Sequence, residues 1–357
     1  MPPAVPQAFL EACLRRPAPF TPIWLMRQAG RYMPEYRAVR ARLGFLELCK
    51  NPEAAAEVTL QPVERLGVDA AILFADILLV LEPLGVGLEF TRGDGPRIGR
   101  PVRSSQAARA LPQINVEDAL GYVFDTVARA RKALADRVPL IGFAGAPFTL
   151  ASYLIEGGPS REFLLTKAFM RAEPGAWAAM MTTLADITGE YLNGQIRAGA
   201  QAVQLFDSWV GTLSPADYRQ FVAPHTRRAI QALRPGVPVI HFGVGTGGLL
   251  PLMKAAGGDV IGLDWRVELG PTWARLGHDV AVQGNLDPAV LLASVDAIRR
   301  AAREILDGAA GRPGHIFNLG HGIHKETPVE HVKTLVDIVH ELSSHRSPLP
   351  REGERAG

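Results

Sequence analysis

Cysteine is scarce in this chain, since only Cys13 and Cys49 occur among 357 residues. Two cysteines cannot build a disulfide framework. Neither belongs to a Cys-x-x-Cys pair or to a cysteine and histidine cluster of the kind that binds zinc. This pattern is typical of proteins from a reducing compartment, so we expect a cytoplasmic protein that holds no metal.

Long apolar runs are also missing, and no stretch approaches the ~20 apolar residues that cross a bilayer. The first residues, 1–5, lack the charged-then-apolar layout of a secretory signal. Charge of neither sign dominates, because 38 basic and 36 acidic residues leave a formal net charge of +2. Without an apolar span or a concentrated basic surface, we expect neither a membrane nor a nucleic acid as partner.

Apolar residues are plentiful, at 47% against 21% charged residues, which is the balance of a soluble globular protein. A chain this long buries roughly three quarters of its unfolded surface on folding. No break in composition divides it. We therefore expect one domain over residues 1–345. The polar, Pro- and Gly-rich segment 346–357 is expected to be a disordered tail.

Eight short apolar segments recur along the chain and are separated by segments of helical length. Several are apolar throughout, as expected of strands that are covered on both faces. Most of the helical segments begin at or near a proline, a residue favoured in the first turn. The expected strands are 22–26, 70–74, 138–143, 202–206, 238–242, 260–264, 280–283 and 315–319. The clearest helical segments are 52–66, 116–135, 174–198, 215–233 and 288–306.

Eight strands that alternate with helices predict an α/β fold, a closed (β/α)8 TIM barrel. A doubly wound open sheet is the alternative, but it usually has a Gly-rich phosphate turn after its first strand. Here the first strand runs into Arg27–Arg31 (RQAGR) instead. One insertion after strand 2, residues 86–101, alternates in polarity around Gly93-Asp94-Gly95, which predicts a small β-hairpin.

Polar or glycine-rich residues follow nearly every expected strand. In a barrel the carboxyl ends of all strands meet at one rim, where the active sites of this fold lie. These segments are therefore predicted to converge on one site. They are 27–31, 76, 145–147, 207–209, 243–248, 264–266, 284–287 and 320–322.

Two arginines, Arg27 and Arg31, frame the turn after the first strand, and Arg37 and Arg40 follow. Guanidinium groups bind carboxylates in bidentate geometry, so several together suit a small polyanion. A solvated basic loop is the alternative. The position directly after the first strand favours anion binding.

Asp76 lies in a strongly apolar segment, residues 70–80. A carboxylate there is costly to bury unless it has a partner or a task. It is either a catalytic group or a structural acceptor for loop N–H groups. Because the arginines share its rim, the catalytic role is favoured.

His321 is flanked by glycines that let a ligand approach the backbone closely, so we expect it to contact a ligand. Tyr153 and Ser208 are weaker candidates, since each can equally serve packing or capping. The segment 243–248 (GVGTGG) is similar to a phosphate-binding loop but lacks its lysine, and is interpreted as a rim loop.

Taken together, these segments resemble the uroporphyrinogen decarboxylase family. The resemblance extends from about residue 7 to about residue 342. It rests on 22–36 (PIWLMRQAGRYMPEY), 74–78 (FADIL), 142–149 (GFAGAPFT), 204–209 (QLFDSW) and 317–322 (FNLGHG).

The resemblance implies a (β/α)8 barrel, usually a homodimer, that needs no cofactor. It implies conversion of uroporphyrinogen III to coproporphyrinogen III by removal of four acetate carboxylates. Asp76 would hydrogen-bond the pyrrole N–H groups and stabilise cationic intermediates, and Arg27 would share in catalysis while binding substrate. The other substrate contacts that it implies are Gln28, Ala29, Gly30, Arg31, Arg40, Phe45, Tyr153, Ser208 and His321.

Two further functions are compatible with such a barrel. Corrinoid-linked methyltransferases share the fold but bind zinc through histidine and cysteine, and Cys13 and Cys49 are poorly placed for that. A non-enzymatic tetrapyrrole carrier would keep the arginines but would not need Asp76. Both alternatives are therefore disfavoured.

Overall fold

The computed structural model describes residues 7–91 and 95–344. The expected tail, 346–357, and the turn residues Gly93 and Asp94 lie outside these ranges. The helices are α1 (Ala8–Cys13), α2 (Pro34–Arg42), α3 (Phe45–Cys49), α4 (Pro52–Leu66), η1 (Leu79–Leu84), α5 (Ser105–Arg109), α6 (Val116–Leu134), α7 (Pro147–Glu156), α8 (Leu164–Ala172), α9 (Pro174–Ala198), η2 (Val210–Thr212), α10 (Pro215–Asp217), η3 (Tyr218–Val222), α11 (Ala223–Gln231), α12 (Leu250–Ala256), α13 (Leu269–Leu276), η4 (Pro288–Leu292), α14 (Val295–Ala309) and α15 (Val329–Ser343).

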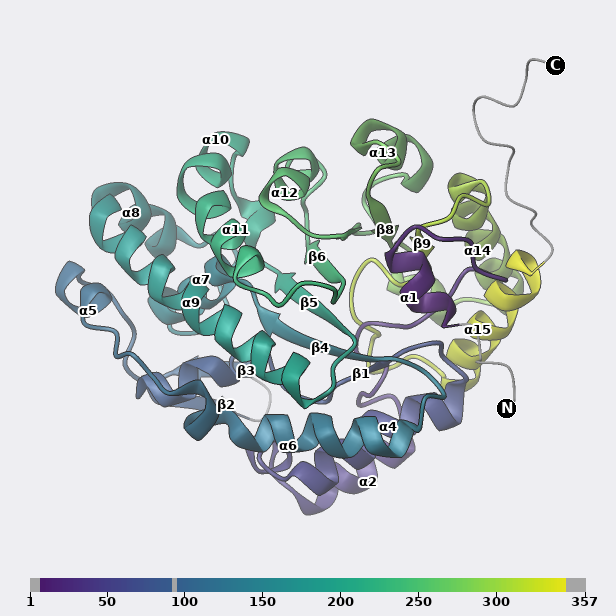
Figure 1. Cartoon of the computed structure of the whole chain (residues 1–357), viewed down its shortest axis with the longest axis horizontal. Coiled ribbons are helices and arrows are strands. Elements are labelled where there is room, and N and C mark those ends of the chain that lie inside the picture. Colours follow the sequence, from purple (N-terminus) through teal and green to yellow (C-terminus); the bar gives the residue numbers. More distant parts are fainter. Residues whose placement is uncertain (1–6, 92–94, 345–357) are drawn as a thin grey trace.

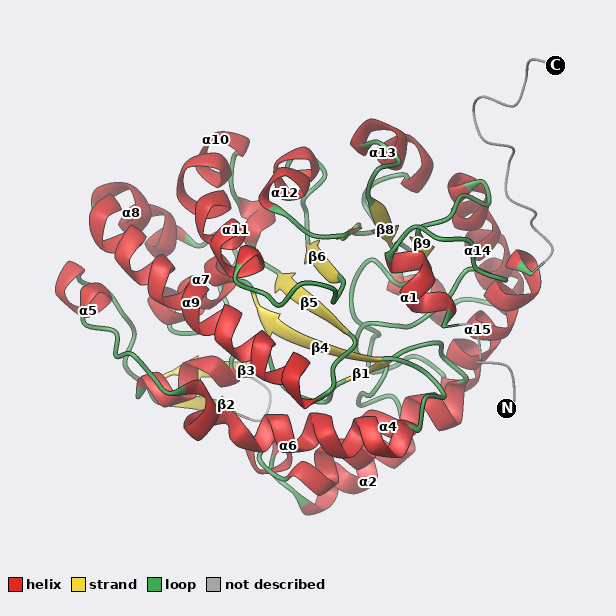
Figure 2. Cartoon of the chain, viewed as in Figure 1, coloured by secondary structure: helices red, strands yellow, loops and turns green. Residues whose placement is uncertain are grey.

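Seven parallel strands form the central sheet, and helices surround it (Figures 1 and 2). The strands follow chain order across the sheet, without the reversal of order that marks a doubly wound fold. Seven of the eight expected strands are therefore present. They are β1 (Ala71–Ile72), β4 (Leu140–Gly145), β5 (Ala202–Asp207), β6 (Val239–Gly243), β7 (Val260–Gly262), β8 (Ala281–Gln283) and β9 (His315–Ile316).

The first expected strand, 22–26, does not form a strand, and only Ile23 bridges Phe317, just beyond β9. The Phe317 N–H donates to the Pro22 carbonyl (2.8 Å), and the Asp69 N–H donates to the Ile23 carbonyl (2.8 Å). The Ile23 N–H, however, donates to the Asp69 carboxylate (2.7 Å). Because the Asp69 side chain accepts this N–H, the segment does not form regular strand hydrogen bonds with the residues before β1. The segment still connects the β9 edge of the sheet to the residues before β1.

Two short strands, β2 (Leu88–Thr91) and β3 (Gly95–Ile98), pair antiparallel within the segment predicted to be a hairpin. The Ile98 N–H donates to the Gly157 carbonyl (2.9 Å). This hydrogen bond ties the pair to the end of α7.

Two of the long helices expected from the sequence are interrupted. The run 215–233 divides into α10, the π-helical turn η3 and α11. Pro224 has no N–H and cannot continue a regular helix from the preceding turn. In the run 288–306, η4 ends before Ser294, whose hydroxyl caps the new helix α14 by accepting the Ala297 N–H (3.3 Å).

The inside of the curled sheet is filled by apolar side chains from several strands, with Phe9 of α1 packed among them. Trp24, Ile141, Ile240 and Ile316 belong to this cluster and are fully buried. Because α1 packs against the start of β9, it closes the amino end of the sheet, a role that the sequence did not suggest. The carboxyl end is left for the rim loops. Among the described helices, none is both long and apolar enough to cross a bilayer.

Candidate active site

Arg27 stands at the carboxyl rim in a left-handed conformation, with a φ of 61° that is uncommon for a residue with a side chain. The turn is closed by the Gln28 N–H, which donates to the Leu25 carbonyl (2.9 Å). The Arg27 side chain then crosses Gly322, where an added Cβ would lie 2.8 Å from the arginine Cγ. Strained backbone of this kind is common at functional sites, where the surrounding fold holds it in place.

Gln28 is fully buried, and its side chain serves the turn. Its amide oxygen accepts the Leu25 N–H (3.0 Å), and its amide nitrogen donates to the Ala70 carbonyl (3.0 Å). Its own carbonyl accepts the Tyr32 hydroxyl (2.6 Å). The geometry therefore gives Gln28 a positioning role: it ties the arginine turn to the start of β1.

Arg31 and Arg37 differ in their surroundings. Arg31 is exposed. Arg37 instead donates to the carbonyls of Arg31 (2.9 Å) and Tyr32 (2.8 Å). Arg37, which the sequence grouped with the anion-binding arginines, thus holds the turn from the side of α2. Ala29 and Gly30 lie half-buried between these arginines.

Asp76 follows β1 and is half-buried. Its Oδ1 accepts the Leu78 N–H (2.9 Å), whereas none of the hydrogen bonds within the described ranges engages Oδ2. Burial raises the pKa of Asp76 to about 6, against the opposing effects of the Leu78 N–H and the Arg27 charge. Asp76 therefore has one oxygen fixed by the loop and one oxygen available to a ligand.

Phe74, two residues before Asp76, belongs to an aromatic cluster that forms a wall of the rim. Phe45 packs against Phe74 (ring centroids 6.0 Å apart) and against Phe90 of β2 (4.7 Å). The Arg40 guanidinium lies 5.5 Å from the Phe45 ring centroid and donates to the Leu43 carbonyl. Arg40, in the last turn of α2, is therefore anchored to the residue that follows this helix and lies beside the Phe45 ring.

Tyr153 of α7 and the segment after β5 form another part of the rim. Tyr153 is buried, and its ring centroid lies 5.9 Å from that of Trp209. Burial, and secondly the negative charge of Asp76, raise the pKa of Tyr153 to about 12, while the Arg27 charge opposes the shift. Ser208, between β5 and Trp209, is half-buried.

Asp207, the last residue of β5, belongs to the predicted rim segment 207–209 but was not selected as an individual site residue. It is fully buried, and its Oδ1 accepts the Thr149 hydroxyl (3.0 Å). The same hydroxyl accepts the Trp209 N–H (3.4 Å), while Asp207 Oδ2 is buried without a hydrogen-bond partner in the described chain. Burial raises the pKa of Asp207 to about 7. A carboxylate that ends an apolar strand was the available signal, and it is the same signal that singled out Asp76.

His321 lies after β9, and its ring packs edge-on against Trp265 (centroids 5.9 Å apart, 84°). Burial is the main cause that lowers its pKa to about 4, and the charges of Arg27, His324 and Arg266 add to the effect. The imidazole is therefore neutral at pH 7.

The electrostatic effects show which candidates the fold brings together. The charge of Arg27 lowers the pKa values of Asp76, Tyr153 and His321. These four residues are far apart in the sequence but lie at one rim. A partly buried carboxylate near cations at the carboxyl end of a parallel α/β sheet is the arrangement typical of an enzyme that acts on small anionic molecules.

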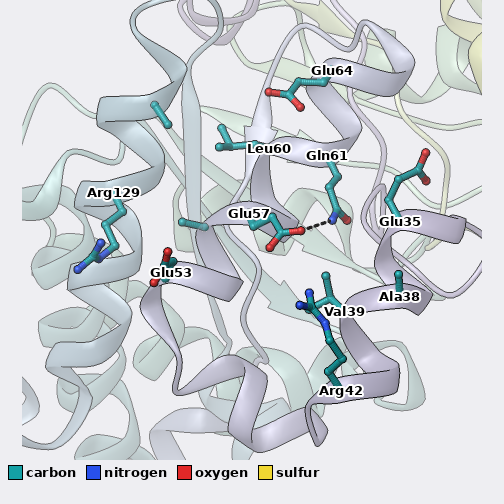
Figure 3. Close-up of a pocket in the computed structure, with 12 residues that line it drawn as sticks. Glu35, Ala38, Val39, Arg42, Glu53, Glu57, Leu60, Gln61, Glu64 and Arg129 are labelled. Carbon is teal, nitrogen blue, oxygen red and sulfur yellow. Dashed lines mark hydrogen bonds between the residues drawn. The ribbon is translucent and has the colours of Figure 1, made fainter.

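A separate groove of about 660 Å³ lies between α2, α4 and α6 (Figure 3). It is lined by Glu35, Glu53, Glu57 and Glu64 against only two arginines, Arg42 and Arg129. An acidic groove of this kind repels a polycarboxylate, so it is less suited to such a ligand than the rim with its arginines.

Among the residues that the structure describes, metal ligands do not gather at the rim. Cys13 and Cys49 are both buried, and both are free cysteines that form no disulfide. In the part of the chain that the structure describes, no three His, Cys, Asp or Glu side chains are grouped to hold a metal ion.

Comparison with known proteins assigns the family. The chain matches the family model described as Uroporphyrinogen decarboxylase (URO-D) over residues 5–342. Uroporphyrinogen decarboxylase of Carboxydothermus hydrogenoformans is 57% identical over 337 residues, 94% of this chain and 96% of that protein. The protein of the same name from Sorangium cellulosum is 55% identical over 348 residues, 97% of this chain and 99% of that protein. The chain belongs to the uroporphyrinogen decarboxylase family, and it is an enzyme of the carboxy-lyase class.

A solved methyltransferase from Methanosarcina mazei superimposes with a TM-score of 0.79, covering 94% of this chain and 98% of that one. The two sequences are 19% identical. At this identity the likeness concerns the fold and not the reaction.

Proposed function

We propose that this chain converts uroporphyrinogen III to coproporphyrinogen III and CO2 at the rim around Arg27 and Asp76, without a cofactor. The observation that carries the proposal is the Asp76 carboxylate, whose Oδ2 is available beside the Arg27 charge. A tetrapyrrole with carboxylate side chains and central N–H groups presents the two complementary partners.

Decarboxylation needs an acceptor for the electron pair of the broken C–CO2 bond, and many enzymes recruit a cofactor for this purpose. A pyrrole can serve itself, because a proton added to a ring carbon makes the ring an iminium-like acceptor. CO2 then leaves as the electron pair moves into the ring. A proton is added to the former acetate carbon, and the ring carbon releases its own. Each cycle replaces one carboxylate by hydrogen and consumes one proton.

Asp76 is assigned to the cationic ring. Its free oxygen would accept the pyrrole N–H groups, and its negative charge would stabilise the positive charge that develops after protonation. In a site that excludes water, a preorganised group of this kind is worth ~10²–10³ in rate. Because its pKa is about 6, the carboxylate is mostly ionised at neutral pH.

Arg27 and Arg31 are assigned to the substrate carboxylates. Each charge-assisted contact contributes ~1.5–3 kcal/mol. Tyr153, Ser208 and the neutral His321 would line the cleft, with Phe45 and Arg40 in its wall. Arg27 would also act on the reacting region through its positive charge, which lowers the pKa of Asp76. Guanidinium is a poor acid. The proton would therefore come from Tyr153, whose pKa of about 12 still lies below that of water, or from a water molecule in the cleft.

The proposal extends to the architecture. The segment 22–26 would complete a (β/α)8 barrel as its eighth strand position. The Ile23 bridge to Phe317 and the hydrogen bond from the Asp69 N–H support this placement. The β2–β3 pair would be a small insertion after the second barrel strand, β1. We further propose one domain over residues 1–345, a homodimer and a cytoplasmic location, the last supported by the two unpaired cysteines.

The direct test is to incubate the purified chain anaerobically with uroporphyrinogen III and to measure CO2 together with the tetrapyrrole products. We expect four CO2 for each coproporphyrinogen III formed. A tetrapyrrole carrier would bind the substrate unchanged, and a methyltransferase would release no CO2. Either result would overturn the proposal.

A further inference from the structure

The loop after β7, residues 264–266, holds another cation of the rim, Arg266, which the reaction described above does not use. Asp264 anchors the loop, since it is buried and its carboxylate accepts the backbone N–H groups of Gly245 and Arg266, the latter at 2.9 Å. Its Oδ2 also accepts the Arg266 Nη1 (2.9 Å). The carboxylate is thus enclosed, with its oxygens bonded to protein.

The guanidinium of Arg266 lies over an aromatic ring. Its Cζ lies 3.8 Å from the Trp265 ring centroid. This cation–π contact restricts the guanidinium group, so that less entropy is lost when it binds a carboxylate. One of its five N–H donors is engaged by Asp264, and the side chain is 51% exposed. The other donors are therefore available to a ligand.

Arg266 and Arg27 flank the same short segment, residues 320–322. Trp265 packs edge-on against His321. A Cβ at Gly320 would lie 2.8 Å from the Trp265 Cα, and a Cβ at Gly322 would lie 2.8 Å from the Arg27 Cγ. Glycines on both sides of the histidine thus allow the two arginine-bearing loops to approach it.

We propose that Arg266 binds a peripheral carboxylate of the substrate, so that Arg27 and Arg266 hold carboxylates on the two sides of His321. The inference rests on the proposed function, because it requires a substrate that carries several carboxylates on one ring system. The half-exposed guanidinium, placed over Trp265 and oriented by the buried Asp264, is the preorganised geometry that such recognition needs. Arg266 is a substrate-positioning residue and takes no part in proton transfer.

Arg266→Gln tests the proposal, and Arg300→Gln is its matched control. Arg300 is exposed on α14 and loses the same charge. The KM for uroporphyrinogen III should rise about tenfold in Arg266→Gln, with kcat changed less than about threefold. Its KM should also depend less on ionic strength than that of the wild type, because one ion pair is lost. Arg300→Gln should match the wild type in all three respects.

A binding measurement separates this inference from the proposed reaction. Uroporphyrin, the oxidised octacarboxylate, should quench tryptophan fluorescence with a weaker affinity in Arg266→Gln than in the wild type. If Asp264 without its partner destabilises the single variant, Asp264→Asn/Arg266→Gln removes both charges, and the same losses are expected. Unchanged KM and unchanged uroporphyrin affinity would overturn the role of Arg266. Failure of the wild type to release CO2 would overturn the proposed reaction instead.

Discussion

The side chain of Arg27 lies across the backbone of Gly322, so two residues from opposite ends of the chain share one contact at the rim. A Cβ at position 322 would lie 2.8 Å from the Arg27 Cγ and 3.0 Å from its Nε. Gly322 is not in a left-handed conformation, so its backbone accepts an alanine. The glycine is needed because of the path of the arginine.

Gly322→Ala should therefore displace Arg27 without unfolding the protein. We expect KM for the tetrapyrrole to rise by about tenfold, because a charge-assisted contact is weakened. The loss should be smaller than in Arg27→Ala, in which the contact is absent. Gly248→Ala is the control, since an added Cβ there meets nothing within 4 Å. If Gly322→Ala has the KM of Gly248→Ala, the contact does not position the arginine.

Asp76→Asn should reduce kcat much more than it weakens substrate binding. Asparagine keeps the acceptor for the Leu78 N–H but not the negative charge opposite the pyrrole cation. Loss of one preorganised group corresponds to about 10²–10³ in kcat. Steady-state kinetics with uroporphyrinogen III give kcat and KM separately. Near-normal turnover would show that the carboxylate is a structural acceptor, the alternative that the sequence left open.

The same substitution should stabilise the fold at neutral pH. The folded pKa of Asp76, about 6, lies above the unfolded value of ~3.9. Between these values the folded state binds more protons, so the free energy of unfolding falls as pH rises from about 4 to about 6. Asp76→Asn escapes this loss, which amounts to about 1–3 kcal/mol. Urea unfolding should show a more stable variant at pH 7.5 and a small difference at pH 4. A less stable variant at pH 7.5 contradicts the raised pKa.

Thr149→Val should loosen the segment that carries Ser208 and Trp209. The threonine hydroxyl donates to Asp207 and accepts the Trp209 N–H, and valine can do neither. We expect the free energy of unfolding to fall by about 1–3 kcal/mol, because the buried carboxylate loses its partner. Thr149→Ser keeps the hydroxyl and should be closer to the wild type. Equal denaturation midpoints for the two variants would rule out this role.

Much of the architecture could be predicted from the sequence. Apolar runs bounded by glycine and polar residues placed seven strands within a few residues of their positions. Polar residues after those strands predicted a common rim, because parallel strands present their carboxyl ends on one side. The arginine turn and Asp76 were chosen on the same ground.

The role of each candidate depended on contacts between distant parts of the chain. Gln28 and Arg37 follow Arg27 within ten residues, yet both hold the turn through side-chain hydrogen bonds that no local pattern encodes. The segment 22–26 likewise has the composition of a strand. It does not form a regular strand, because the Ile23 N–H donates to the Asp69 carboxylate and not to a neighbouring backbone.

The sequence by itself determined which residue types stand at the rim. Only the tertiary structure decided their neighbours, and neighbours set the chemistry. Burial together with the nearby Arg27 charge sets the pKa of Asp76 and keeps His321 neutral. The contact with Trp265 orients the guanidinium donors of the half-exposed Arg266. Electrostatic and packing effects of this kind act through space, so they follow from the fold and not from the order of residues.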